Sequence, residues 1–294
     1  MRTLLTAALL AACLPASAQF GGLGNLLNKG VETVKKTQEA NREFTTDDEV
    51  ALGTGITAGV LGASKLHPDQ NLQRYVNRVG KWLAMHSDRP GLPWSFGVID
   101  TETINAFAMP GGMVIISSGL LKNLGSEAEL AGALAHEIAH VVMKHQLAAI
   151  RSSMNSDILA GIGKEVAGQA ISNRVGGNDA FGLKSAAGGA LASAGVDAVK
   201  NGVFLRPLDR GMEYDADRLG VVIAARSGYD PYGLVGVLQV LSQLKSDGGG
   251  AAIFDTHPAA GERIDELEKF MPTIADRLPP TMPQLEARFK QVVK

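Results

Sequence analysis

The chain has 294 residues, of which 45% are hydrophobic and 20% are charged, and its formal net charge is −2. These values are those of an ordinary globular protein in which one domain can bury a substantial core, and two domains are possible. They exclude a strongly basic surface, so no nucleic-acid partner is expected. Beyond the N-terminus no segment reaches about 18 unbroken apolar residues, so no transmembrane helix is predicted.

Residues 1–18 have the pattern of a signal peptide. A basic Arg2 precedes the apolar stretch Leu4–Leu14, and Ala16-Ser17-Ala18 fits a cleavage site. Cleavage after Ala18 would export the protein. There is one alternative: the only cysteine, Cys13, ends a lipobox-like stretch, so the protein could instead be a lipoprotein anchored through Cys13.

The next part of the chain predicts a leader followed by helices and a small sheet. Residues 19–43 are rich in Gly and Asn and then polar, which predicts a loose N-terminal leader segment. A helix is expected to begin at Thr46, and apolar spacing predicts another over Asp69–His86. Strands are expected at Trp94–Ile99, Ile104–Met109 and Met113–Ser117, the last two joined by a hairpin turn at Pro110-Gly111-Gly112.

The motif that carries the chemistry is His136-Glu137-Ile138-Ala139-His140. On a helix, positions four apart are offset by only about 40°, so both imidazoles project from one face. Two neutral imidazoles with this spacing can bind one Zn²⁺, and Glu137 lies where it can take a proton from a water without being a ligand. The motif therefore predicts one zinc ion per chain and Glu137 as the catalytic base.

The residues around this motif predict a buried helix over Glu127–Gln146. Ser126 followed by Glu129 fits a capping box, and Leu130–Val142 is nearly all apolar. The motif alone could arise by chance with both histidines exposed, but two buried histidines and a glutamate would be costly unless paired or metal-bound. His145, five residues after His140, is expected to face away from the metal side and is given no role.

A third ligand is expected from a second helix. Glu213 and Asp217 are four residues apart and so share a helix face. One carboxylate can bind zinc, which makes Glu213 the candidate ligand, and Asp217 is expected to accept the N–H of His136. The alternative is a solvated acidic face paired with Arg210 and Arg218. Two histidines and one glutamate leave a fourth position open, which is typical of a catalytic site.

These motifs together resemble a known family. HEIAH followed by Glu-x-x-x-Asp at Glu213–Asp217 resembles a gluzincin, and the wider sequence resembles the peptidase family of the CAAX prenyl proteases, the HtpX-type membrane proteases and the periplasmic BepA-like proteases. The resemblance covers roughly Phe44–Phe270. Without a predicted transmembrane helix, the soluble BepA-like branch fits best, here without a tetratricopeptide tail. Four further stretches carry the resemblance: Asn105–Gly112, Ser118–Leu121, Met212–Gly220 and Thr256–Arg263.

The resemblance implies a fold and a function. It implies an α+β, mostly helical zincin-type metalloprotease domain over residues 44–272, with a small β-sheet whose edge strand borders the active-site cleft, and a C-terminal tail over 273–294. The implied activity is zinc-dependent endopeptidase cleavage of unfolded or misassembled envelope proteins in the Gram-negative periplasm, with the outer-membrane assembly machinery as a candidate partner. The alternative is a chaperone-like binding protein that uses the same cleft with little proteolysis; Glu137 favours the enzyme.

The resemblance also assigns roles to residues outside the metal motifs. Asn105, Ala106 and Phe107 are expected to form the edge strand that pairs with the substrate backbone; the alternative is a structural hairpin with Asn105 bonded locally. His257 is expected near the metal, either as a hydrogen-bond donor to the oxyanion or as a fourth ligand in a resting state. A helix-capping loop histidine is the alternative. Arg263 is assigned to substrate binding.

Residues 147–205 separate the two halves of the expected metal site. They are unusually rich in Gly, Ala and Ser, and glycine-rich helices are marginal in water. Two interpretations stay open: a lid or membrane-adjacent flap over the cleft, or an insertion with no gating role.

Overall fold

A computed structural model describes most of the expected metalloprotease domain. The described residues are 43–153, 207–246, 253, 257, 260–274 and 286–293. The predicted signal peptide (1–18), the alternative lipid anchor at Cys13, all but the last residue of the leader (19–43) and residues 154–205 of the lid or insertion (147–205) lie outside them.

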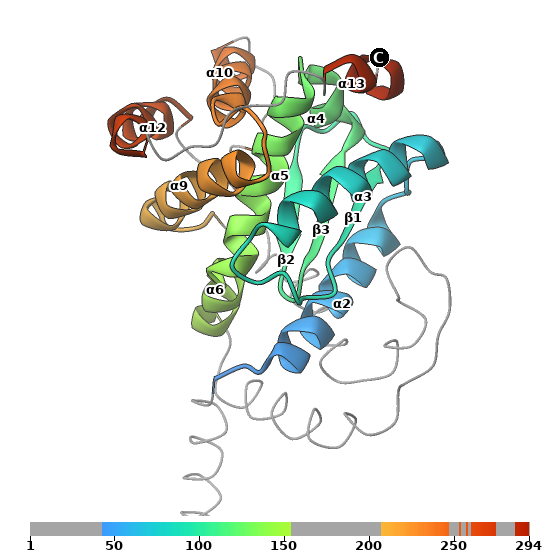
Figure 1. Cartoon of the computed structure of the whole chain (residues 1–294). Helices are drawn as coiled ribbons and strands as arrows, with labels where there is room; N and C mark the ends of the chain where they lie inside the picture. The colour runs from blue at the N-terminus through green and yellow to red at the C-terminus, as the bar shows by residue number, and fades with distance from the viewer. Residues whose placement is uncertain are drawn as a thin grey trace, which may run out of the picture.

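The fold is mostly helical around one three-stranded sheet (Figure 1). The strands are β1 (Ser95–Ile99), β2 (Ala106–Met109) and β3 (Met113–Ser117), in the spatial order β1-β3-β2. β1 runs parallel to β3, and β2 pairs antiparallel with it, as the predicted hairpin requires. Gly111 and Gly112 form the turn with φ of 80° and 99°, values that favour glycine. The predicted α+β fold is confirmed, and β2 is an edge strand.

Helices surround this sheet on both faces. None of those in the described part of the chain is both long and apolar enough to cross a membrane. Their bounds are α2 Thr46–Ala63, α3 Gln70–Met85, α4 Ser118–Asn123, α5 Glu127–Val142, α6 His145–Ser153, α9 Arg210–Arg226, α10 Gly233–Ser246, α12 Ala260–Ile274 and α13 Glu286–Val293.

The alternation of side chains along β3 divides the core into two clusters. Val114 and Ile116 belong to the larger cluster, which surrounds α5 and includes residues of α3, α9 and α10. Met113 and Ile115 point the other way, into a smaller cluster with apolar residues of α2 and α6. Because both faces of β3 are covered, every residue of the strand is buried. The sheet is therefore a rigid base beside which α5 is fixed.

Close helix packing brings α9 and α10 against α5, as Figure 1 shows. A Cβ atom at Gly220 of α9 would lie 3.0 Å from the backbone nitrogen of His136. A Cβ atom at Gly132 of α5 would lie 2.5 Å from the nitrogen of Leu234 in α10. Glycine at these two positions lets the backbones approach, which brings the acidic side chains of α9 within reach of the histidines of α5.

The predicted single helix over Glu127–Gln146 is wrong at its C-terminal end. The helix α5 ends at Val142, and α6 begins at His145 after a sharp turn. At the turn Lys144 adopts a left-handed conformation with φ of 60°, which an α-helix cannot continue. The short turn changes the direction of the chain and so changes where His145 points.

The predicted C-terminal tail over residues 273–294 contains a helix that packs on the domain. Phe289 of α13 is fully buried in the larger cluster. Arg288 pairs with Glu127, a fully buried carboxylate in the first turn of α5. The hydroxyls of Tyr75 and Tyr229 donate to the same carboxylate over 2.7 and 2.8 Å. The C-terminal helix therefore stabilises the start of the helix that carries the histidine motif.

Candidate metal centre

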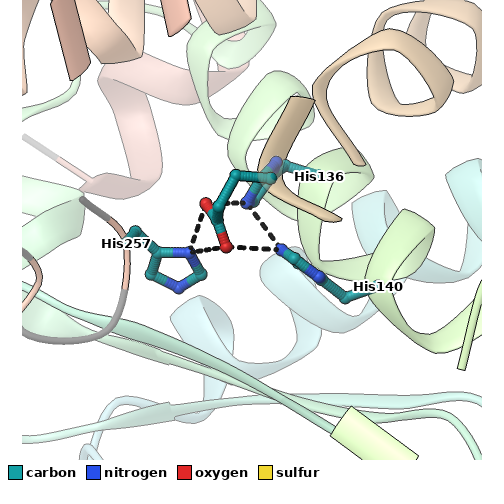
Figure 2. Close-up of side chains that lie close together, drawn as sticks. His136, His140 and His257 are labelled. Carbon is teal, nitrogen blue, oxygen red and sulfur yellow. Dashed lines mark hydrogen bonds and ion pairs between the residues drawn. The ribbon is translucent and has the colours of Figure 1, made fainter. Parts of the chain in front are cut away.

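Three histidines and one glutamate converge in the interior of the protein. The potential ligand atoms of His136, His140, Glu213 and His257 all lie within 4.8 Å of one another, and all four residues are buried. Figure 2 shows the three histidine rings directed at one carboxylate, that of Glu213. The structure thus brings together ligand candidates from α5, from α9 and from the segment between α10 and α12.

The spacing of these atoms fits a tetrahedral ion. His136 Nε2 lies 3.0 Å from His140 Nε2. The carboxylate oxygens of Glu213 lie 3.7 Å from His136 Nε2 and 3.4 Å from His140 Nε2. Four ligands at about 2.0–2.1 Å from a tetrahedral Zn²⁺ would be about 3.3–3.4 Å apart. The donor set of two imidazoles and a carboxylate therefore fits Zn²⁺ in both chemistry and spacing.

Asp217 contacts the ring nitrogen of His136 that points away from the other candidate ligands. Its Oδ1 lies 2.9 Å from His136 Nδ1, so His136 directs Nε2 at the other ligands and Nδ1 at Asp217. Arg263 binds the same carboxylate through Nε at 2.8 Å and Nη2 at 2.6 Å. Burial alone would raise the pKa of Asp217, but the Arg263 guanidinium and the hydrogen bonds lower it to about 2. Asp217 is therefore an ionised acceptor at neutral pH.

Arg263, the predicted substrate-binding residue, lines the same cavity as Glu137 and His257 and also pairs with two carboxylates. Its side chain is 4% exposed, and Nη1 lies 3.1 Å from Glu213 Oε2 in addition to the contacts with Asp217. Most of the guanidinium is thus used to pair two carboxylates of α9. This arrangement fits a residue that fixes the ligand and its neighbour from behind.

The charges of the site match those that a metal ion needs. Burial would raise the pKa of Glu213, but His257 and Arg263 lower it to about 2. Burial and the neighbouring histidines hold the pKa of His140 well below its usual value. An ionised carboxylate and a neutral imidazole are the protonation states in which these side chains coordinate a cation. For His257, burial acts to lower the pKa, but the Glu213 carboxylate at 3.0 Å outweighs it and raises the pKa.

Glu137 has a free carboxylate oxygen beside the ligands. Its side chain is buried, and Oε2 has no hydrogen-bond partner among the described residues. Its Oε1 lies 3.7 Å from His257 Nε2. Glu137, His136, His257 and Ala106 line a cavity of about 30 Å³. Because about 10–15 Å³ is enough for one water molecule, the cavity can place a water next to Glu137.

The predicted substrate strand lies at the edge of the sheet, next to this cavity. The N–H of Ser117 donates to Asn105 O, and the antiparallel alternation then directs the backbone groups of Ala106 and Ala108 away from β3. Asn105 Oδ1 accepts the N–H of Ala106 over 2.9 Å, which is the local bond of the alternative interpretation. The side chain of Phe107 packs with the smaller cluster on the α2 side. Only Ala106 of the predicted trio lines the cavity.

His145 contacts one of the candidate ligands, a contact that was not predicted from the sequence. His145 is buried, and its Nδ1 lies 3.0 Å from Nδ1 of His140. The expectation that it faces away is wrong because α5 ends before it. The sequence did not indicate that the helix ends before His145, because lysine at position 144 is a good helix former and the chain nearby has no glycine or proline.

The architecture is that of the zincin-type metalloprotease fold: a histidine motif on a buried helix, a glutamate from a second helix and the edge strand of a small sheet. Residues 70–271 match the model of Peptidase family M48, and the chain belongs to this family. This finding confirms the family resemblance that the motifs indicated.

Curated relatives are consistent with this assignment. A beta-barrel assembly-enhancing protease from Yersinia pestis is 28% identical over 228 residues, which cover 77% of this chain and 44% of that protein. Mitochondrial metalloendopeptidase OMA1 from Schizosaccharomyces pombe is 29% identical over 228 residues, which cover 74% of this chain and 60% of that protein. Metalloprotease YcaL from Escherichia coli (strain K12) is 29% identical over 196 residues, or 66% of this chain and 69% of that protein. The chain spans less than half the length of the first of these relatives.

Proposed function

We propose that the protein is a zinc-dependent endopeptidase that cleaves unfolded or misassembled polypeptides of the cell envelope. His136, His140 and Glu213 would hold one zinc ion, and Glu137 would be the base. The observation that carries the proposal is the free oxygen of Glu137 at a water-sized cavity beside three converging ligands. A protein that only binds polypeptides would not need a buried carboxylate with one oxygen left without a hydrogen-bond partner, which is why hydrolysis is favoured over a chaperone-like function.

Each residue of the site has its own role in the proposed peptide hydrolysis. A bound Zn²⁺ would acidify a water and polarise the substrate carbonyl. Glu137 takes the proton from that water and gives it to the leaving amine. Asp217 and Arg263 keep the ligands oriented while this happens. His257 lies near enough to Glu137 either to donate a hydrogen bond to the developing negative charge on the carbonyl oxygen or to act as a ligand itself.

The edge strand supports a polypeptide substrate. Apart from the Ala106 N–H, which Asn105 Oδ1 accepts, the outward backbone groups of β2 can pair with an extended chain, largely without regard to its sequence. Unfolded chains offer such segments, whereas folded proteins have few of them. The name of the Yersinia pestis relative connects it with β-barrel assembly, which supports envelope proteins as substrates and the outer-membrane assembly machinery as a partner here. The export signal over residues 1–18, or lipidation at Cys13, would deliver the protein to the periplasm.

Zinc content and proteolysis test the proposal together. The purified protein is expected to hold about one zinc ion per chain and to digest casein in a reaction that a chelator stops. His136→Ala and Glu213→Ala should each lose the zinc, because each removes one of three ligands. Metal that stays stoichiometric in both variants would contradict the ligand assignment, and zinc-loaded protein that binds casein without cutting it would favour the chaperone-like alternative.

Asp217→Asn is expected to weaken zinc binding by about 10–100-fold, because the ionised acceptor of His136 Nδ1–H is lost. The measurement is a competition titration against a chromophoric chelator. Asp215→Asn, at an exposed residue of the same helix, is the matched control. An affinity equal to that of the wild type in Asp217→Asn would show that this contact does not support the ligand.

A further inference from the structure

We infer that His145 is a positioning residue that fixes the orientation and tautomer of His140 through the contact between their Nδ1 atoms. The inference rests on the proposed zinc site and names the residue that supports its second histidine. His140 directs Nε2 at His136 and Glu213, and it directs Nδ1 at His145, 3.0 Å away. Both side chains are buried, so the contact is not one of two freely moving surface groups.

The proton arrangement of this contact follows from the role of His140. Two ring nitrogens 3.0 Å apart form a hydrogen bond only if one of them carries a proton and the other does not. A His140 that coordinates through Nε2 must carry its proton on Nδ1 and is therefore the donor. His145 is then the acceptor at Nδ1 and carries its own proton on Nε2. In the metal-bound state this contact keeps the proton of His140 on Nδ1 and leaves Nε2 to the ion.

The break between α5 and α6 is what brings His145 to this position. In an unbroken helix, a residue five positions after His140 would point about 140° away from it. Instead, the left-handed Lys144 starts a new helix in another direction. A left-handed conformation costs a non-glycine residue about 1–2 kcal/mol, so other contacts must hold it.

A buried carboxylate from α2 supplies such contacts. Glu49 is 1% exposed and lies 2.9 Å from Lys144 Nζ through one oxygen and 2.8 Å from Arg89 Nη1 through the other. Arg89 Nη1 also donates to the carbonyl oxygen of Val141, in the last turn of α5, over 3.3 Å. Glu49 thus joins α2 to both sides of the break. The turn that presents His145 is held in place by these ion pairs.

The two histidines of the motif are consequently supported in different ways. His136 has an ionised carboxylate, Asp217, whose charge is shared with Arg263. His140 has the neutral acceptor His145. A second carboxylate in place of His145 would add negative charge to a site that already contains Glu213 and Glu137. An imidazole orients His140 without adding charge.

Zinc affinity in matched variants tests this inference. His145→Leu removes the acceptor and should weaken zinc binding by about 10–100-fold, the usual effect of losing such a partner. His145→Asn keeps an acceptor oxygen close to the position of Nδ1 and should bind zinc within a few-fold of the wild type. His86→Leu, at the C-cap residue of α3 whose Nδ1 contacts Trp82 O, is the control and should leave the affinity unchanged. Thermal unfolding without metal shows whether each variant is folded.

The tautomers give a second test that needs no variant. In the zinc-loaded wild type, long-range ¹H–¹⁵N spectra should show His145 protonated at Nε2 and His140 protonated at Nδ1. Wild-type zinc affinity in folded His145→Leu, or a proton on Nδ1 of His145, would overturn the inference and leave the proposed function intact. A wild-type protein without stoichiometric zinc would overturn both.

Discussion

Glu137→Gln is expected to lower peptidase activity by about 10²–10⁴-fold or more while the protein keeps its zinc. The amide has nearly the shape of the carboxylate, so the cavity and the ligands stay as they are. However, it cannot take up the proton that a water in the cavity beside Glu137 would give up. The measurement is the rate of casein cleavage together with the zinc content of the same preparation.

A second glutamate of the same helix provides the control. Glu129 lies in the first turn of α5, where Oε2 accepts the N–H of Gly125 over 2.7 Å, about two helical turns or roughly 10 Å along the helix before His136. Glu129→Gln should therefore cleave casein at close to the wild-type rate. If Glu137→Gln also retained near wild-type activity with zinc bound, Glu137 would not be the base.

The direction of side chains on one helix could be predicted from the sequence because it depends only on local geometry. His136 and His140 face each other through Nε2, as the four-residue spacing requires. The same rule places Glu213 and Asp217 on one face of α9. The packing of α9 against α5 is a long-range contact that residue spacing does not predict. The expectation that Glu213 joins the two histidines came from the family motifs.

Two features of the site depend on contacts between distant parts of the chain, which local sequence patterns do not predict. Just after the end of α5, Lys144 pairs with Glu49, almost a hundred residues earlier in the chain. Local spacing contains no such contact, and the expected direction of His145 was wrong. Arg263 also depends on long-range packing. Its role in substrate binding stays a prediction, whereas its burial between Asp217 and Glu213 follows from the packing of α12 on α9.

His257 has a position that is consistent with both of its proposed roles. Its Nδ1 lies 3.0 Å from Glu213 Oε2, and its Nε2 lies 3.7 Å from Glu137 Oε1. Its ring can therefore reach a metal ion held by His136 and His140, or an oxygen of the substrate. One of its ring nitrogens lies within 4.8 Å of the ligand atoms of the other three candidates. This proximity supports a resting state in which His257 occupies the fourth ligand position.

His257→Ala is therefore expected to raise basal proteolysis, because removing the ring opens a position that substrate would otherwise have to clear. The wild type would be a two-state system in which substrate binding favours the open state. A protease that attacks unfolded chains needs such restraint among newly exported proteins. The measurement is casein cleavage by zinc-loaded protein, with His67→Ala, at a histidine outside the ligand cluster, as the control. A fall of about 10²–10³-fold would instead assign His257 to oxyanion stabilisation. An unchanged rate would contradict both roles, since a ring this close to Glu213 and Glu137 would then contribute to neither state.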